Sequence, residues 1–168
     1  MTELRFGGAT DVGAVRANNQ DSFLVAHPLF AVADGMGGHQ AGEVASAAAL
    51  QPIAELDGAT FDDELQTAEA LRAAIEAANS AVVSQAKADP SLAGMGTTLT
   101  AVIVRDGQLY LAHVGDSRAY LLRPGEQINQ LTTDHTLVEQ LVQDGRLSRD
   151  EIASHPQRSV ITRAIGVE

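Results

Sequence analysis

The order of apolar segments predicts an α+β fold, in which helices pack on antiparallel β-sheets. Short apolar or β-branched runs come first, two long segments with helical character follow, and short strand-like runs then return. The Asp106-Gly107 pair between two such runs predicts a tight hairpin, because a type I′ turn needs positive φ at both central positions. At 168 residues and 45% apolar composition, the chain is long enough for one domain with a substantial core.

Seven segments are expected to form strands. Each is short and either apolar or β-branched, and turn residues separate them, for example at His27-Pro28 and Arg123-Pro124-Gly125. The first of these turns is expected to pair the strands on either side of it. The expected strands are residues 4–10, 22–26, 29–33, 97–104, 109–114, 119–122 and 128–131.

Two long helices are expected in the middle of the chain and two short ones near its end. Residues 43–56 are rich in alanine, which has the highest helix propensity. Residues 62–87 repeat apolar side chains at helical spacing, behind an acidic start that complements the helix dipole. Residues 137–142 predict a short helix that Gly145 caps, and residues 148–153 predict a further helical turn.

Composition excludes several functional classes. The net charge of −11, with Lys87 the single lysine among 11 basic residues, repels nucleic acid and anionic lipid but suits divalent cations. Without cysteine, the chain has no disulfide, thiolate zinc site or cysteine nucleophile. No apolar run approaches the roughly 18 residues of a membrane span, and the start lacks signal-peptide features. We expect a cytoplasmic single domain over residues 1–168 without membrane contact, and leave open a membrane span beyond Glu168.

The segment around Asp34 is the most informative part of the chain. The apolar run 30–33 leads directly into Asp34-Gly35-Met36-Gly37-Gly38-His39. A strand that ends in Asp-Gly places a carboxylate and a bare backbone carbonyl together, and Mg²⁺ or Mn²⁺ binds such oxygen ligands. A glycine at position 35 lets its carbonyl approach a hydrated ion without an intruding Cβ. Asp-Gly is also common in ordinary turns, so a turn-only role for Asp34 stays open at this point.

Four motifs occur in a fixed order along the chain. They are Arg16-Ala-Asn-Asn-Gln-Asp21, Asp34-Gly-Met-Gly-Gly-His39, Gly94-Met-Gly-Thr-Thr98 and His113-Val-Gly-Asp-Ser-Arg118. Together they resemble the metal-dependent Ser/Thr protein phosphatases of the PP2C (PPM) family, particularly the bacterial branch. The resemblance implies a four-layer α-β-β-α sandwich of two antiparallel sheets flanked by helix pairs, with metals at one end. It also implies a flap-like subdomain at residues 134–166, beside the active site.

The resemblance implies a metal-binding role for four residues. Asp34 would bridge two Mg²⁺ or Mn²⁺ ions, and Gly35 would offer its carbonyl to the second ion. Asp21 would lie in or just outside the coordination sphere, its alternative being a cap for the strand that follows. Asp116 would help to hold a third, weaker ion. Two cations roughly 3.5–4 Å apart can clamp a bridging water and lower its pKa towards neutrality.

Substrate contacts are also implied. Arg16 would grip the phosphate, because a guanidinium matches phosphate oxygens in a bidentate fork. Met36 stands where many eukaryotic relatives have a general-acid histidine, and methionine cannot donate a proton. Water or His39 would therefore protonate the leaving group. His39 could instead orient the substrate. Arg158 and Arg163 would steer phosphopeptides, with structural salt bridges as an equal alternative.

Several nearby residues have plain structural interpretations. Asp116 and Arg118 have the spacing of an ion pair across a turn. His113 alternates with apolar neighbours in a strand and is expected to pack in the core. His135 and His155 lie in polar segments and are expected to face solvent or a mobile flap.

The resemblance implies hydrolysis of phosphoserine and phosphothreonine in proteins by water that two metal ions activate. The partners implied are phosphorylated proteins, bacterial Ser/Thr kinases and the substrates of those kinases. Two further acidic motifs of the family, Asp-Gly and Asp-Asn, have no counterpart here, so the C-terminal strands are expected to be missing and residues 1–168 alone to have little activity. The alternative is a catalytically impaired or dead binding module. No Gly-x-x-x-x-Gly-Lys-Ser/Thr loop supports a nucleotide-binding protein.

Overall fold

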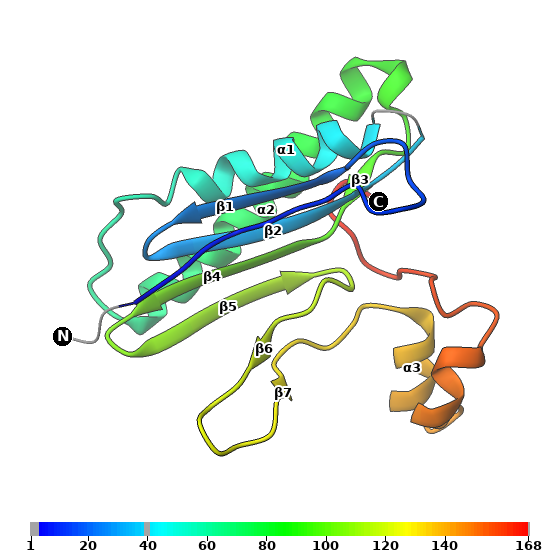
Figure 1. Ribbon diagram of the computed structural model, residues 1–168. Coiled ribbons are helices and arrows are strands. Elements are labelled where there is room, and N and C mark those ends of the chain that lie inside the picture. The colour runs from blue at the N-terminus through cyan, green and yellow to red at the C-terminus, as the bar shows by residue number, and fades with distance from the viewer. Residues whose placement is uncertain (1–3, 39–40, 168) are drawn as a thin grey trace.

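The structure is a computed structural model that describes residues 4–38 and 41–167. An antiparallel sheet lies under two long helices, and a smaller region with short elements lies beside it (Figure 1). The strands are β1 (Asp21–Ala26), β2 (Leu29–Met36), β3 (Gly96–Thr97), β4 (Leu99–Arg105), β5 (Gln108–Val114), β6 (Tyr120–Leu121) and β7 (Asn129–Gln130). The helices are α1 (Ala41–Ala54), α2 (Glu64–Ala88) and α3 (Leu137–Gln143), with 3-10 helices η1 (Pro90–Leu92) and η2 (Arg149–Ser154).

The main sheet has the order β1-β2-β4-β5, with β3 also paired to β2. Both expected hairpins form, since β1 pairs with β2 and β4 pairs with β5 in antiparallel register. Asp106 and Gly107 connect β4 to β5 with φ values of 52° and 75°, the positive values that the sequence predicted. The predicted α+β class is confirmed, and the two long helices lie within two residues of their predicted bounds at each end.

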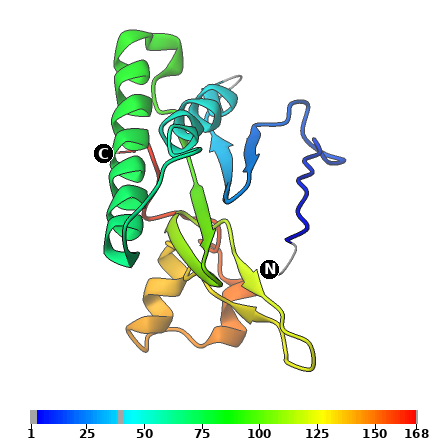
Figure 2. The same cartoon turned by 90° about the vertical axis from the view of Figure 1, so that its left-hand side faces the viewer.

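Helices α1 and α2 cover one face of the sheet (Figure 2). Alternate residues of β2, namely Leu29, Ala31 and Ala33, point under the helices and are buried. The alanine-rich face of α1 allows a close approach to the sheet, and Ile53 at its end is fully buried. This side of the sheet therefore holds the core. Its buried members are Leu29, Ala31, Ala33, Ala41, Ala45, Ala48, Ala49, Leu50, Ile53, Leu71, Ala74, Ala78, Val82, Met95, Leu99, Ala101, Ile103 and Ile165.

The opposite face of the sheet is much more open. Val32, in the middle of β2, is 46% exposed on this side. Residues 7–9 lie over part of the face and line a cavity there of about 420 Å³. The Phe6 ring approaches the rings of His27 and Phe30, at centroid distances of 5.7 and 5.4 Å. The predicted strand at residues 4–10 is wrong, because this segment makes side-chain contacts without joining a ladder.

The smaller region contains the elements after β5. The strands predicted at 119–122 and 128–131 shorten to β6 and β7, which pair only with each other. The predicted short helices form as α3 and η2. Two isolated bridges, Thr97–Ile165 and Thr136–Ile161, tie the end of the chain back to earlier segments. Among the described residues, no helix has the length and apolar character needed to cross a membrane.

Candidate functional site

Asp34 lies near the end of β2 with a second carboxylate directly beside it. Its cross-strand partner in the β1–β2 ladder is Asp21. Burial raises the pKa of Asp34, and the charge of Asp21, a hydrogen bond between the two carboxyl groups and the charge of Asp116 raise it further. The Arg16 guanidinium, whose Nη1 lies 4.0 Å from Asp34 Oδ1, offsets part of this effect. A negative charge on Asp34 is therefore destabilised by its surroundings, and a bound cation would offset this destabilisation.

A cavity of about 550 Å³ opens at Asp34. It is formed by five parts of the chain: the segment before β1, the end of β2 with the turn after it, Thr98 between β3 and β4, and two more distant segments around 116 and 160. Three of the predicted metal-binding residues therefore share one cavity with the predicted phosphate-binding arginine, and Asp21 contacts Asp34 from just outside its lining. The lining residues are Arg16, Gln20, Asp34, Gly35, Met36, Gly37, Thr98, Asp116, Ser159 and Ile161.

Gly35 is required by packing at this site. A Cβ added there would lie 2.0 Å from the carbonyl oxygen of Gly42 and 2.6 Å from that of Gln20. The Gly35 N–H also donates a hydrogen bond to the Gln20 carbonyl, at 3.2 Å. The start of α1 and the chain before β1 thus close on Gly35 from two sides. From the sequence, we expected a glycine at this position because its carbonyl could then approach an ion. The close packing around Gly35 was not predicted.

Other predicted site residues lie elsewhere. Neither Arg158 nor Arg163 lines the Asp34 cavity; instead Ser159 and Ile161 of the same segment do. Arg163 lines a separate cavity of about 680 Å³, between α2 and the end of the chain. His39 falls outside the described residues. No sequence signal marked Ser159 or Ile161, because their proximity to Asp34 depends on how the chain returns after η2.

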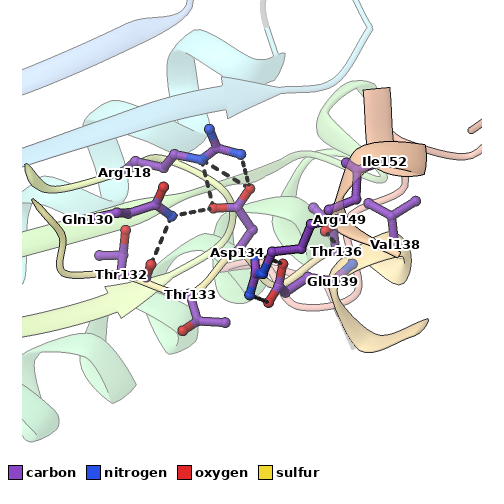
Figure 3. Close-up of a pocket in the computed structure, with 10 residues that line it drawn as sticks. All are labelled: Arg118, Gln130, Thr132, Thr133, Asp134, Thr136, Val138, Glu139, Arg149 and Ile152. Carbon is purple, nitrogen blue, oxygen red and sulfur yellow. Dashed lines mark hydrogen bonds and ion pairs between the residues drawn. The ribbon is translucent and has the colours of Figure 1, made fainter. Parts of the chain in front are cut away.

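The alternative role considered for Asp116, an ion pair with Arg118, is not found among the described residues. Arg118 instead pairs with Asp134 through Nη2 at 2.6 Å and through Nε at 2.9 and 3.1 Å (Figure 3). Hydrogen bonds to Asp134 raise the pKa of Arg118 above its usual value. Arg118 is therefore paired with Asp134 and not with Asp116. The spacing in the sequence was right for a local pair, but the carboxylate at Asp134 offers the bidentate geometry that arginine prefers.

A polar cavity of about 270 Å³ surrounds this pair, and Figure 3 shows its lining. Gln130 Nε2 donates to Asp134 Oδ1 at 3.3 Å, which joins β7 to the same carboxylate. Across the cavity, Arg149 of η2 pairs with Glu139 of α3 at 3.0 Å. These contacts hold the short elements together with charged groups beside the buried side chain of Val138.

His113 and His135 stack on each other where β5 meets the segment before α3. Their ring centroids are 5.1 Å apart. His113 Nδ1 lies 2.9 Å from Thr100 Oγ1, and His135 Nδ1 accepts the Gly115 N–H at 3.1 Å. Burial lowers the pKa of both histidines. The prediction for His113 is confirmed in part, since it packs half-buried at the edge of the core, whereas the prediction that His135 faces solvent or a mobile flap is wrong.

The oxygen donors around Asp34 are of the kind that bind a hard divalent cation. Crowded carboxylates with a raised Asp34 pKa, beside a cavity of about 550 Å³, are features that a bound cation would stabilise, and the neighbouring Arg16 guanidinium suits an anion. Within residues 4–38 and 41–167, however, no three His, Asp or Glu side chains lie close enough to hold a metal alone. Backbone oxygen, water or further residues would therefore complete the coordination, as is usual for Mg²⁺.

An acidic cavity flanked by arginine at the end of a β-sheet is the kind of site that a metal-dependent phosphoester hydrolase uses. The family model described as protein phosphatase 2C matches residues 8–141. The chain belongs to this family. The family that the four motifs indicated is therefore confirmed.

Named relatives agree with the family match. The chain is 50% identical over 162 residues to the serine/threonine protein phosphatase PstP of Mycobacterium tuberculosis, covering 96% of this chain and 31% of PstP. It is 41% identical over 168 residues to the serine/threonine phosphatase stp of Listeria monocytogenes, covering 95% of this chain and 66% of that protein. The chain thus spans from about a third to just under two thirds of the length of these relatives.

One similar solved structure contains metal ions. The crystal structure of the catalytic domain of a PstP phosphatase in complex with two manganese ions superposes with a TM-score of 0.80 at 46% identity. The match covers 92% of this chain and 63% of that domain. The architecture described above is therefore that of a bacterial phosphatase domain over most of this chain.

Proposed function

We propose that the protein containing this chain hydrolyses phosphoserine and phosphothreonine in other proteins, in a reaction that depends on Mg²⁺ or Mn²⁺. The observation that carries the proposal is the gathering of Arg16, Asp34 and Asp116 around one cavity in a chain of the protein phosphatase 2C family. Phosphate ester hydrolysis is very slow in water, so the site must stabilise much negative charge. The cavity holds the residue types needed for that task.

Asp34, Asp21, Asp116 and the carbonyl of Gly35 are the groups that we propose hold the cations, two or three in number. When bound, such cations act as Lewis acids and lower the pKa of water. Asp34 is the central ligand in this proposal, because the charges of both other carboxylates reach it. The metal-bound relative supports the choice of cation, since manganese occupies that phosphatase domain.

Arg16 is proposed to bind the substrate phosphate. Its side chain is 63% exposed and its ion pair with Asp34 is long at 4.0 Å, so the guanidinium can turn towards an incoming anion. A phosphate held there would lie beside the Asp34 carboxylate. Lysine could not replace arginine fully, because it lacks the planar fork that grips two oxygens.

The remaining proposals concern the leaving group and the partners. Met36 lines the cavity but cannot donate a proton, so we assign protonation of the leaving group to His39 or to water. Arg158 adjoins Ser159, which lines the cavity, and is proposed with Arg163 to meet the peptide around the phosphoresidue. Bacterial Ser/Thr kinases and their phosphorylated substrates, in the cytoplasm, are the proposed partners.

Hydrolysis of p-nitrophenyl phosphate and of a phosphothreonine peptide tests this proposal in the protein at its full natural length. We expect turnover that requires added Mn²⁺ and falls by about 100-fold or more in Asp34→Asn, since charge stabilisation is lost. Residues 1–168 alone should show little turnover. Metal-independent turnover, or full activity of Asp34→Asn, would show that the proposed site is wrong.

A binding module without catalysis is the second candidate. The observation that favours it is the lack, within the described residues, of three closely gathered metal-ligating side chains. Calorimetric titration of the full-length protein with Mn²⁺ separates the two candidates. A dead module should take up no pair of cations, whereas the phosphatase should bind at least two.

A further inference from the structure

Thr98, at the end of the third sequence motif, lies directly across the sheet from Asp34. Gly35 pairs with Thr97 in the β2–β3 register, so Asp34 falls opposite Thr98. The Thr98 N–H donates to the Asp34 carbonyl at 2.9 Å, while the Asp34 N–H donates to Thr98 Oγ1 at 2.9 Å. A side-chain hydroxyl thus receives the N–H of the central carboxylate residue, at the point where β3 gives way to β4.

The same hydroxyl reaches the turn that carries Asp116. Thr98 Oγ1 lies 2.6 Å from the Oγ of Ser117, the next residue after Asp116. Gly115, on the other side of Asp116, has φ of +110°, and a Cβ there would lie 2.6 Å from Thr98 Cγ2. The Ser117 carbonyl also accepts the Thr100 hydroxyl at 3.2 Å. The residues on both sides of Asp116 therefore lie against the side chain of Thr98.

The chemistry of a hydroxyl allows both contacts at once. Its oxygen has two lone pairs and one proton, so it can accept the Asp34 N–H and still share a hydrogen bond with Ser117. Thr98 is only 1% exposed, so bulk water has little access to replace either contact. Hydrogen bonds just outside a metal site commonly orient its ligands and tune its affinity.

We propose that Thr98 is a positioning residue that holds the Asp34 and Asp116 carboxylates in a fixed relation across the cavity. It acts through the backbone of Asp34 and through the hydroxyl of Ser117. The inference rests on the proposed function for the role of the carboxylates. The hydrogen-bonded link itself can be tested without any metal.

Amide hydrogen exchange and Mn²⁺ titration of the full-length protein test the proposal together. Thr98→Val keeps the side-chain shape but removes the acceptor, so the Asp34 amide should exchange about tenfold faster. Mn²⁺ affinity should fall about 10- to 100-fold. Thr98→Ser keeps the hydroxyl and should stay within about threefold of the wild type in both measurements, on the same energy scale.

Ser117→Ala separates the two contacts of the hydroxyl. The Asp34 N–H keeps its acceptor in this variant, so its exchange should change little, whereas Mn²⁺ affinity should fall as in Thr98→Val. A matched control is Thr67→Val on α2, because Thr67 is also fully buried and its hydroxyl donates to the Asp63 carbonyl at 2.9 Å. Both the Asp34 exchange rate and Mn²⁺ affinity should stay at wild-type values in Thr67→Val.

Each outcome bears on a distinct claim. Unchanged Asp34 exchange and unchanged Mn²⁺ affinity in Thr98→Val would overturn the positioning role. If Thr98→Val does not fold, wild-type Mn²⁺ affinity in Ser117→Ala would overturn it instead, and weakened affinity with Thr98→Ser intact would support it. If the wild-type chain takes up no Mn²⁺, the metal proposal fails for this chain, and the exchange rates alone decide whether Thr98 holds Asp34.

Discussion

Two regions of this molecule are held together in different ways. The sheet β1–β5 with α1 and α2 is stabilised by a buried apolar core that includes Ile53 and Leu99. The region from 115 to 164 has few buried apolar side chains, Val138 among them, and relies on ion pairs, isolated bridges and a pair of stacked histidines. The Asp34 cavity lies between them: Asp34 belongs to the first region, Arg16 to the segment just before β1, and Asp116, Ser159 and Ile161 to the second region.

The difference shows how the site combines a rigid half with a more adjustable half. Packed cores resist displacement, whereas segments with few buried apolar contacts open at lower free energy. Asp34 is fixed by the sheet and by Thr98, so its position should vary little. The segment that carries Ser159 and Ile161 belongs to the second region, for which we expect a lower free energy of local opening. Variants in each region test whether the two regions differ in this way.

Gly35→Ala should have the largest effect. The new Cβ would collide with the backbone of Gly42 and Gln20, and neither can move without shifting α1 or β1. We expect a loss of about 4 kcal/mol or more in unfolding free energy, measured by urea denaturation. Gly38→Ala is the control, because a Cβ there meets nothing within 4 Å. Equal stability of the two variants would show that Gly35 is not packed as described.

Ile53→Ala should lower global stability by about 2–5 kcal/mol, because Ile53 is 0% exposed at the end of α1. Thermal unfolding monitored by circular dichroism measures this loss. Hydrogen exchange should show that β2 and β4 amides lose protection together with the rest of the sheet. Ile152→Ala is the comparison, since Ile152 on η2 is only partly buried and should cost much less.

Arg118→Ala should loosen the second region selectively. It removes the partner of Asp134, whose side chain is only 13% exposed, and should cost about 1–3 kcal/mol locally. Hydrogen exchange should accelerate in residues 118–136 while β2 and β4 stay protected. Arg72→Ala on α2 breaks an exposed pair with Glu76 and should change neither region measurably. Uniform loss of protection in Arg118→Ala would mean that the two regions unfold as one.

A smaller effect is expected from acid. Burial lowers the pKa of both His113 and His135, so the unfolded chain binds their protons at higher pH than the folded chain. Their stabilising contribution is complete above the ordinary histidine pKa of about 6.5 and is lost as pH falls through the lowered folded values. The unfolding temperature should therefore be lower at pH 5.5 than at pH 7.5, which lie about one unit below and above the ordinary histidine pKa.

His135→Asn provides the control for this pH dependence. Asparagine can still accept the Gly115 N–H but cannot take up a proton, so the difference between the two pH values should shrink. Asp134, Asp116 and Arg163 also act on the pair and remain in both proteins. A pH response identical to that of the wild type would assign the effect to other groups.

Features encoded by neighbouring residues could be predicted from the sequence. The Asp106-Gly107 hairpin and the two long helices depend on local propensity, and the structure has them where expected. The strand at 4–10 was predicted wrongly because local alternation cannot show whether a partner strand lies alongside. Pairing of Arg118 with Asp134 was missed for a similar reason, since an ion pair across 16 positions depends on the fold.

The candidate site shows the same limit. The motif positions Arg16, Asp34 and Asp116 do meet at one cavity, as the family resemblance led us to expect. Ser159 and Ile161 were missed, although the segment containing them had been predicted to lie beside the site. Which face of such a segment points inward is set by its path over the surface, which no short pattern in the sequence encodes.

Mn²⁺ binding by Asp34→Asn tests the central claim most directly. The account predicts that calorimetry of the full-length protein detects Mn²⁺ binding in the wild type and a loss of more than about 100-fold in Asp34→Asn. Without metal, the variant should unfold at a higher temperature than the wild type, because it removes a carboxylate that burial and its neighbours destabilise. Equal Mn²⁺ affinity in the two proteins would contradict the account.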